Sequence, residues 1–281
     1  MTHKCNKPSA ASLFPVLPTG LTGLPRMAAA AEHVDDGHLV EFRALKVRGV
    51  LNRSVSKRLS WLAYSINPYR GCEFGCRYCY ARYTHEFLAP GLVGEQDRTG
   101  ALSAGATLRE PQAFERIIFL KQHAAWLLEQ DLKGFNPAQQ IAIGTATDPY
   151  QPIERKAGIT RSLLQVFARR HGYRLGIVTK SNLIERDIDL LSEIAARNAL
   201  TVHITITTPD ARLARILEPR APRPDLRFAA VKKLRDAGIR TGILCCPLLP
   251  GITDSEPALD RMARRAAEVG ACFFAANPLF L

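Results

Sequence analysis

The stretch Asn67-Pro-Tyr-Arg-Gly-Cys-Glu-Phe-Gly-Cys-Arg-Tyr-Cys-Tyr80 places three cysteines, Cys72, Cys76 and Cys79, within eight residues. Three thiolates so close in sequence can surround one metal centre, and the intervening glycines permit tight backbone turns. Structural zinc normally takes four protein ligands, often as two CxxC or CxxC/HxxxH pairs, and no second pair occurs here. An iron–sulfur cluster held by three cysteines leaves one iron open to another ligand. The spacing favours such a cluster, and a Cys3His zinc site with His85 is the alternative.

The composition describes a globular chain. It has 281 residues, of which 47% are hydrophobic and 23% are charged, and this length suits one large domain. No apolar run reaches the roughly 18 residues that a membrane helix needs, so we expect no membrane partner. Seven cysteines, with three of them clustered, indicate metal ligation rather than a disulfide framework. We therefore expect a reducing, cytoplasmic location.

Most of the formal net charge of +12 resides in two segments. Residues 41–90 contain nine Lys or Arg against three acids, and residues 201–240 contain nine against four. One interpretation is two solvated basic faces. The other is a positive rim around one site, which would attract phosphates or nucleic acid.

The amino terminus differs from the rest of the chain. Residues 1–31 contain no acid, and Ser12–Ala31 is mostly apolar, which superficially resembles a signal or transit peptide. Three prolines interrupt that stretch. We predict a disordered leader over residues 1–40, with Met27 as an alternative start, and one core domain over residues 41–281.

Predicted strands and helices alternate along the core. The strands are 62–66, 140–145, 173–179, 201–207, 239–245 and 271–275, and the amphipathic helices are 111–132, 161–171, 187–198, 226–237 and 256–269. For the helix 226–237, Asp225 is the predicted N-cap and Gly238 the stop signal. Such alternation predicts an α/β fold with a parallel sheet or barrel. Because a helix should cover the sixth strand, the sequence predicts either a truncated C-terminus or an open sheet edge.

The predicted strand 201–207 has two different faces. One face carries Val202, Ile204 and Ile206, and the other carries His203, Thr205 and Thr207. A strand between two helical layers would be apolar throughout. The polar face therefore indicates a barrel lumen that holds a ligand, or alternatively an edge strand with one wet face. The cysteines follow the first predicted strand and so lie at the carboxyl, catalytic end of a βα barrel.

The spacing CxxxCxxC, with the aromatic residue Tyr78 just before the third cysteine, resembles the hallmark of the radical SAM superfamily. Other segments resemble its spore-photoproduct-lyase-related branch and that branch's uncharacterised bacterial relatives. They are Asn67–Cys72, Gly144–Glu154, Thr179–Ser181, Glu218–Arg227 and Pro247–Gly251. The resemblance covers about residues 41–281 and implies a partial (β/α)6 TIM-like barrel.

The resemblance implies two cofactors, a [4Fe–4S] cluster and S-adenosylmethionine. Cys72, Cys76 and Cys79 would each bind one iron, and the fourth iron would bind S-adenosylmethionine. An electron from an external donor such as flavodoxin or ferredoxin would cleave it to a 5′-deoxyadenosyl radical, which abstracts hydrogen from a substrate. The cofactors would carry this chemistry, and the protein would position them and exclude water.

The resemblance also implies a set of residues around S-adenosylmethionine. They are Tyr78, Thr147, Asp148, Lys180, Thr205 and Thr207. Tyr78 would pack near the adenine, Thr147 and Asp148 would contact the methionyl ammonium, and Lys180 would pair with the carboxylate. Thr205 and Thr207 would reach the ribose or carboxylate. Each role has an alternative. Tyr78 would be a core aromatic, Asp148 a turn residue before Pro149 and Lys180 a solvated side chain. Thr205 and Thr207 would be ordinary strand residues.

Two further pairs of residues leave alternatives open. Glu218 and Arg227 either contribute to the site or form an ion pair at a helix N-terminus. Spore photoproduct lyases have a hydrogen-donating cysteine near the end of the second strand, and residues 141–150 contain none, which argues against thymine-dimer repair. Cys245 and Cys246 either replace that cysteine or, as the composition of their strand favours, pack as small apolar residues.

Three classes of function follow from the sequence. The first is a radical SAM enzyme with an unidentified substrate. The second is a DNA- or RNA-directed lyase or repair enzyme of the spore photoproduct lyase type, which the two basic segments favour. The third is a non-catalytic metal-binding module, which requires the cysteines to hold zinc.

Overall fold

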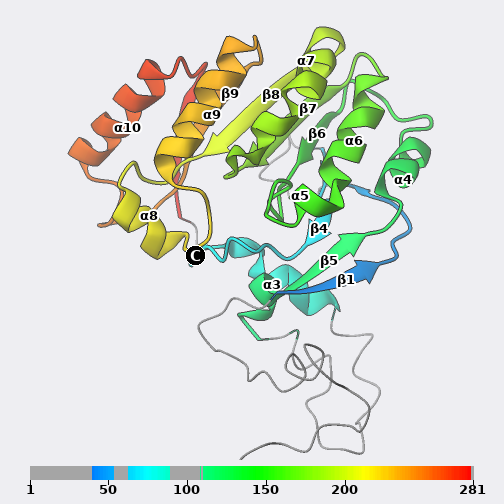
Figure 1. The fold of residues 1–281 in the computed structure, drawn as a ribbon, viewed down its shortest axis with the longest axis horizontal. Helices are drawn as coiled ribbons and strands as arrows, with labels where there is room; N and C mark the ends of the chain where they lie inside the picture. Colours follow the sequence, from blue (N-terminus) through cyan, green and yellow to red (C-terminus); the bar gives the residue numbers. More distant parts are fainter. Residues whose placement is uncertain (1–39, 54–62, 89–107, 109, 280–281) are drawn as a thin grey trace, which may run out of the picture. The chain divides into compact units, whose positions relative to one another are not determined.

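Six parallel strands form most of the main sheet in the computed structural model (Figure 1). In spatial order, which is also chain order, they are β3 (Tyr64–Ile66), β6 (Gln140–Ile143), β7 (Arg174–Thr179), β8 (Ala199–Thr205), β9 (Thr241–Leu248) and β10 (Phe274–Pro278). β2 (Leu51–Arg53) pairs antiparallel with β3. This order confirms the predicted α/β partial barrel.

The structure describes residues 40–53, 63–88, 108 and 110–279, which belong to the compact unit Val40–Leu281. The predicted leader, residues 1–40, lies outside this part of the chain except for Val40. Among the helices within these ranges, none has the length and apolar character needed to cross a bilayer.

Helices cover the outer face of the sheet (Figure 1). They are α4 (Ala124–Asp131), α5 (Glu154–Ala157), α6 (Ile159–Ala168), α7 (Ile188–Arg197), α8 (Ala211–Leu217), α9 (Pro224–Asp236), α10 (Glu256–Glu268) and the 3-10 helix η4 (Asn182–Asp187). The helices predicted over 161–171, 187–198, 226–237 and 256–269 are confirmed. The N-cap assignment of Asp225 is wrong: α9 begins at Pro224, whose fixed φ suits a first helical position, and Arg223 occupies the cap. Gly238 does end this helix, with φ +78°.

Strand β8 has the two faces that its alternation predicts. Val202, Ile204 and Ile206 are fully buried in the core beneath the helices. On the inner face, the ring of His203 lies 5.0 Å from that of Phe273, measured between centroids. Because β8 pairs with both β7 and β9, the edge-strand alternative is wrong.

The single helix predicted over residues 111–132 is wrong. The segment folds as α3 (Ala113–Arg116), strand β5 (Ile117–Lys121) and then α4. β5 pairs with β1 (Glu41–Leu45) and β4 (Tyr69–Arg70) in a second, three-stranded sheet. The reason is tertiary: the run Ile-Ile-Phe buries its side chains between two strands, and β-branched residues suit that setting better than a helix.

Candidate active site

The cysteine loop, which we define as residues 71–80, begins directly after β4. The backbone N–H of Cys72 donates to the carbonyl of Phe114 at 2.9 Å, and that of Cys79 donates to the carbonyl of Cys76 at 3.2 Å. Cys72 and Cys76 are buried in an apolar cluster with Phe74 and Phe114, and the partly exposed Cys79 packs against it. The fold therefore brings the three thiols to one place.

One side of the cysteine loop is fastened to the segment that follows β6. The buried Gln151 side chain accepts from the N–H of Glu73 at 2.9 Å and donates to the carbonyl of Gly71 at 3.3 Å. The hydroxyl of Thr147 donates to that same carbonyl at 2.5 Å. The carboxylate of Glu73 in turn accepts from the N–H of Ile153 at 2.7 Å. These bonds satisfy polar groups that the loop would otherwise bury unpaired.

The opposite side of the loop is fastened to the end of α8 and the connection after it. Arg77 donates from its backbone to the carbonyl of Leu217 at 2.9 Å and from Nε to that of Ile216 at 2.7 Å. The N–H of Arg220 donates to the carbonyl of Phe74 at 3.3 Å. The loop thus joins parts of the chain that lie about 140 residues apart.

Gly75 occupies a position that only glycine fits without displacement. Its φ is +60°, and a Cβ atom there would lie 2.0 Å from Nη2 of Arg220 and 2.4 Å from Oε2 of Glu115. Glu115 also pairs with Arg82 at 3.0 Å. The cysteine loop therefore passes directly under an ion-paired arginine.

The thiols occupy a setting that disfavours free thiolates. Burial raises the pKa of Cys72 well above its usual value and that of Cys76 to about 12, and neighbouring thiols raise both. A metal centre would have to supply the charge that keeps them deprotonated. Among the described residues, no three His, Cys, Asp or Glu side chains are arranged to hold a single metal ion. A donor set of three thiols fits a larger iron–sulfur group with one iron free of protein ligands.

The contacts of His85 do not favour the zinc alternative. Its Nε2 lies 2.9 Å from the carbonyl oxygen of Ile117, and its ring lies edge-on to those of Phe114 and Phe119. It serves the packing of the short 3-10 helix η2 (Tyr80–Leu88) against β5. These contacts favour a structural role for His85 over that of a fourth zinc ligand.

Asp148 fastens the ends of β6 and β7 together. Its carboxylate accepts hydrogen bonds from the N–H of Tyr150 (2.9 Å), the hydroxyl of Thr179 (2.6 Å) and the N–H of Lys180 (2.7 Å). Burial raises its pKa, and these bonds oppose the rise. The bond from the N–H of Tyr150 is the turn interaction that was the alternative role predicted for Asp148. Its contact with a ligand ammonium stays a prediction.

The side chain of Lys180 extends over the cysteine loop. Its Nζ lies 5.6 Å from the centroid of the Tyr78 ring. Burial disfavours its charged form, whereas the Cys76 sulfur and the Glu218 carboxylate favour that form and raise its pKa. The ammonium of Lys180 therefore lies close to the cysteine loop, in a position suited to a ligand carboxylate.

The hydroxyl of Tyr78 ends in a buried polar cluster rather than in apolar packing. It contacts Oε1 of Glu218 and lies 2.9 Å from Oγ1 of Thr207, which donates to the same carboxylate at 3.0 Å. Nη2 of Arg227 lies 2.5 Å from Oε2 of Glu218. Burial would raise the pKa of Glu218, but Arg227 and Lys180 lower it below its usual value. The ion pair named as an alternative is thus present, and it directly supports the site.

The remaining candidates occupy the same end of the sheet. Thr205 is buried at the end of β8, and its carbonyl accepts from Nη1 of Arg227 at 3.1 Å. Cys245 is fully buried in the main core, with its thiol 3.5 Å from the carbonyl of Thr207, as the packing interpretation expects. Cys246, on the other face of β9, is half-buried, with its thiol 3.8 Å from Nδ2 of Asn277.

Sequence reasoning missed the two residues that hold the loop most directly, Gln151 and Glu73. Both lie inside segments that carry the family resemblance, but neither residue type signals a structural role by itself. The contacts pair residues 78 positions apart. Only the meeting of β4 with the end of β6 creates them.

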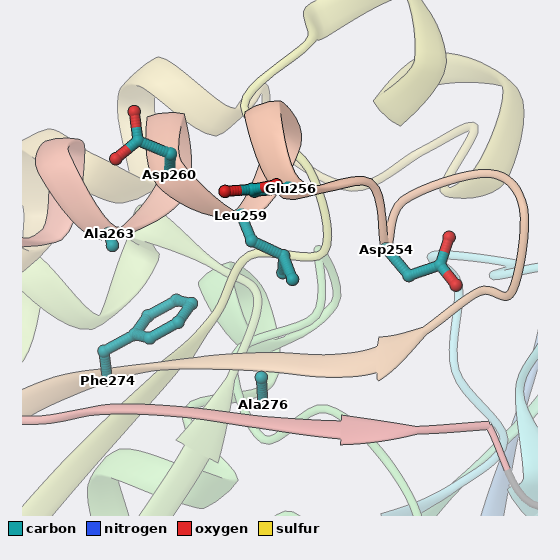
Figure 2. A pocket seen from close by; sticks show the side chains of 7 residues that line it. All are labelled: Asp254, Glu256, Leu259, Asp260, Ala263, Phe274 and Ala276. Atoms are coloured by element: carbon teal, nitrogen blue, oxygen red, sulfur yellow. The ribbon is translucent and has the colours of Figure 1, made fainter.

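A separate hollow of about 500 Å³ lies between α10, with the loop before it, and β10 (Figure 2). Leu259, Phe274 and Ala276 contribute apolar surface to it, and Asp254, Glu256 and Asp260 contribute carboxylates. It contains none of the residues that the sequence assigns to the site. The cysteine end of the barrel therefore remains the candidate active site.

Comparison with known families agrees with this geometry. The family model described as the radical SAM superfamily matches residues 66–263. The chain belongs to the radical SAM superfamily, a class of enzymes, which disfavours the non-catalytic alternative. The iron–sulfur cluster and S-adenosylmethionine are the cofactors that this family implies.

Curated relatives include an uncharacterised protein of Mycobacterium bovis, 30% identical over 89% of this chain and 67% of its own length. An uncharacterised protein of Methanocaldococcus jannaschii is 27% identical over 77% of this chain and 71% of its own length. A solved mutant of spore photoproduct lyase, with bound AdoMet and dinucleoside spore photoproduct, matches with a TM-score of 0.57 and 17% identity. That match covers 85% of this chain and 63% of the lyase chain, and it confirms the fold.

Proposed function

We propose that the protein is a radical SAM enzyme whose residues Cys72, Cys76 and Cys79 hold a [4Fe–4S] cluster. When bound, the reduced cluster supplies the electron that cleaves S-adenosylmethionine into methionine and a 5′-deoxyadenosyl radical, which abstracts hydrogen from a substrate. One observation carries the proposal: three thiols converge at the carboxyl ends of parallel strands, and the ammonium of Lys180 extends over the same loop.

Other residues of the site position S-adenosylmethionine. Lys180 pairs with its carboxylate, because the ammonium already lies beside the cysteine loop. Asp148 fixes the backbone of Lys180 through its N–H and, with Thr147, offers acceptors to the methionyl ammonium. Tyr78 packs near the adenine while its hydroxyl stays anchored on Glu218. Thr205 and Thr207 complete the wall toward the ribose.

Anaerobic reconstitution tests the cluster. We expect about four irons and four sulfides per chain, loss of both in Cys76→Ala, and retention of both in the matched variant Cys272→Ala, whose thiol is exposed and remote from the loop. The reduced protein should release 5′-deoxyadenosine from S-adenosylmethionine. Stoichiometric zinc without iron, or no 5′-deoxyadenosine above the Cys76→Ala level, would exclude the proposal.

A second candidate is an enzyme of this class that acts on nucleic acid in the cytoplasm. Helix η2 exposes the aromatic side chains of Tyr80, Tyr83 and Phe87, and the hydroxyl of Tyr80 contacts the carbonyl of Thr145 at the end of β6. Exposed aromatics beside basic surface are typical of single-strand binding, where bases stack on the rings. Titration with a single-stranded oligonucleotide at increasing salt tests this candidate, and Phe87→Ala should weaken binding.

A further inference from the structure

Reductive cleavage consumes one electron per turnover, so the proposed function requires a reductant that reaches the cysteine loop. We propose that this electron arrives from a small acidic one-electron carrier protein that docks on the donor face. The donor face comprises Arg77, Arg212, Arg215 and Ile216. This inference rests on the proposed function and adds the place where its redox partner binds.

The donor face lies directly against the cysteine loop. Arg77 is the residue between Cys76 and Tyr78, and it bonds to the end of α8 through both its backbone and its side chain. Tyr78 points the other way, toward Lys180. A carrier on α8 would therefore approach the thiols from outside, and the side that receives S-adenosylmethionine would stay open.

The face carries a net positive charge. Arg77, Arg212 and Arg215 are all exposed, and no carboxylate within the described ranges forms an ion pair with any of them. Asp210 accepts from the N–H of Arg212 at 2.7 Å, and its carboxylate offsets part of this charge, so that the three arginines leave an excess of positive charge. Glu218 is buried with Arg227. The charge thus faces solvent and suits an acidic partner.

An apolar residue lies within this basic surface. The side chain of Ile216 is 58% exposed, although its carbonyl is fixed by Arg77. A small apolar contact surrounded by charge matches transient redox encounters, which bury little area and rely on electrostatic steering for their rate. A nucleic acid would use the charge but would leave the isoleucine without a function.

The double variant Arg212→Glu/Arg215→Glu tests the proposal. We would measure 5′-deoxyadenosine release with three reductants: dithionite, a reduced bacterial flavodoxin and a reduced ferredoxin. The dithionite rate should be unchanged, which also shows that the variant folds and holds its cluster. The rate with the better protein carrier, at subsaturating carrier, should fall by about tenfold or more and lose most of its salt dependence.

The matched control is Lys133→Glu/Arg174→Glu, which reverses two exposed cations on the connection into β6 and at the start of β7, the end of the sheet opposite the cysteine loop, and should leave all three rates unchanged. If dithionite gives no 5′-deoxyadenosine with the unmodified protein, the proposed function fails and this inference with it. If dithionite works but neither carrier does, or the α8 variant accepts electrons at the normal rate, the inference alone is overturned. Loss of oligonucleotide binding with normal carrier rates would assign the face to nucleic acid instead.

Discussion

Arg227 and Glu218 face each other beneath the cysteine loop, with Nη2 and Oε2 2.5 Å apart and each side chain only 1% exposed. Arg227 also donates from Nε to the carbonyl of Pro222 at 2.7 Å and from Nη1 to that of Thr205 at 3.1 Å. Glu218 accepts a hydrogen bond from the hydroxyl of Tyr78. One buried ion pair therefore connects the end of β8, the start of α9 and the cysteine loop.

Breaking this pair should be costly. Glu218→Ala leaves the Arg227 guanidinium buried without its partner, and we expect the free energy of unfolding to fall by about 3–5 kcal/mol. Urea unfolding of the metal-free protein measures the change. The double variant Glu218→Met/Arg227→Met should recover part of the loss, because it removes both buried charges. A loss below about 1 kcal/mol in the single variant would show that the pair is not important for stability.

Gly75→Ala should disturb the cysteine loop more than the addition of one methyl group suggests. The new alanine would have to keep a left-handed backbone conformation, and its methyl group would displace Arg220 from Glu115. Gly134→Ala is the matched control, since Gly134 has φ +72° and a Cβ added there would meet no atom within 4 Å. The control should cost about 1–2 kcal/mol from strain alone, and Gly75→Ala clearly more, with reduced iron content after reconstitution. Equal costs for the two variants would show that the Arg220 side chain moves aside without loss of stability.

Lys180→Met tests the proposed contact with the carboxylate of S-adenosylmethionine. The variant removes a charge-assisted contact worth about 1.5–3 kcal/mol, so affinity should fall roughly ten- to hundredfold. Equilibrium binding to the reconstituted protein measures this, and the iron content should stay the same. Unchanged affinity would remove Lys180 from the binding site, and loss of iron would indicate a role in holding the loop.

Lys121 is a buried cation whose replacement should stabilise the protein. Burial, with help from the charge of Arg70, lowers its pKa from 10.5 to about 8. The unfolded chain therefore binds this proton more tightly, and the free energy of unfolding contributed by this group rises between about pH 8 and pH 10.5. Lys121→Met should raise stability at pH 7 by on the order of 2 kcal/mol.

Thermal unfolding of Lys121→Met and the unmodified protein across pH 7–10 checks the sign. The advantage of the variant should shrink as the pH rises, because the unmodified lysine then becomes neutral in the folded protein. Lys232→Met is the control, since Lys232 lies on the surface of α9 and pairs only with Asp236. A constant difference at every pH would exclude protonation as the cause.

The sequence predicted those elements whose signals are local. The six parallel strands and four covering helices follow from alternation of apolar runs with helical periodicity. The exception is the segment 117–121, whose strand conformation could not be predicted from local sequence signals. Its apolar run fits a helix face, and its true partners, β1 and β4, lie far away in sequence and are short.

The residues of the candidate site also fall into two groups: those that the local sequence identifies and those that only the fold brings together. The three cysteines are recognisable from spacing alone, and Lys180 from its place after a strand. The hydrogen bonds by which Gln151 and Glu73 hold the cysteine loop were not predictable, because ordinary polar residues acquire that role only when two distant segments meet. The sequence could name both members of the Glu218–Arg227 pair, but their position against Tyr78 required the fold.

The attachment of the cysteine loop to residues 216–221 has a consequence for synthesis. The carbonyls of Ile216 and Leu217 that hold Arg77, and the N–H of Arg220 that holds Phe74, are translated about 140 residues after the cysteines. Because a chain emerges from the ribosome amino end first, the loop spends that interval without the partners that shape it. We therefore expect iron insertion to follow translation of the α8 region, when these partners of the loop are present.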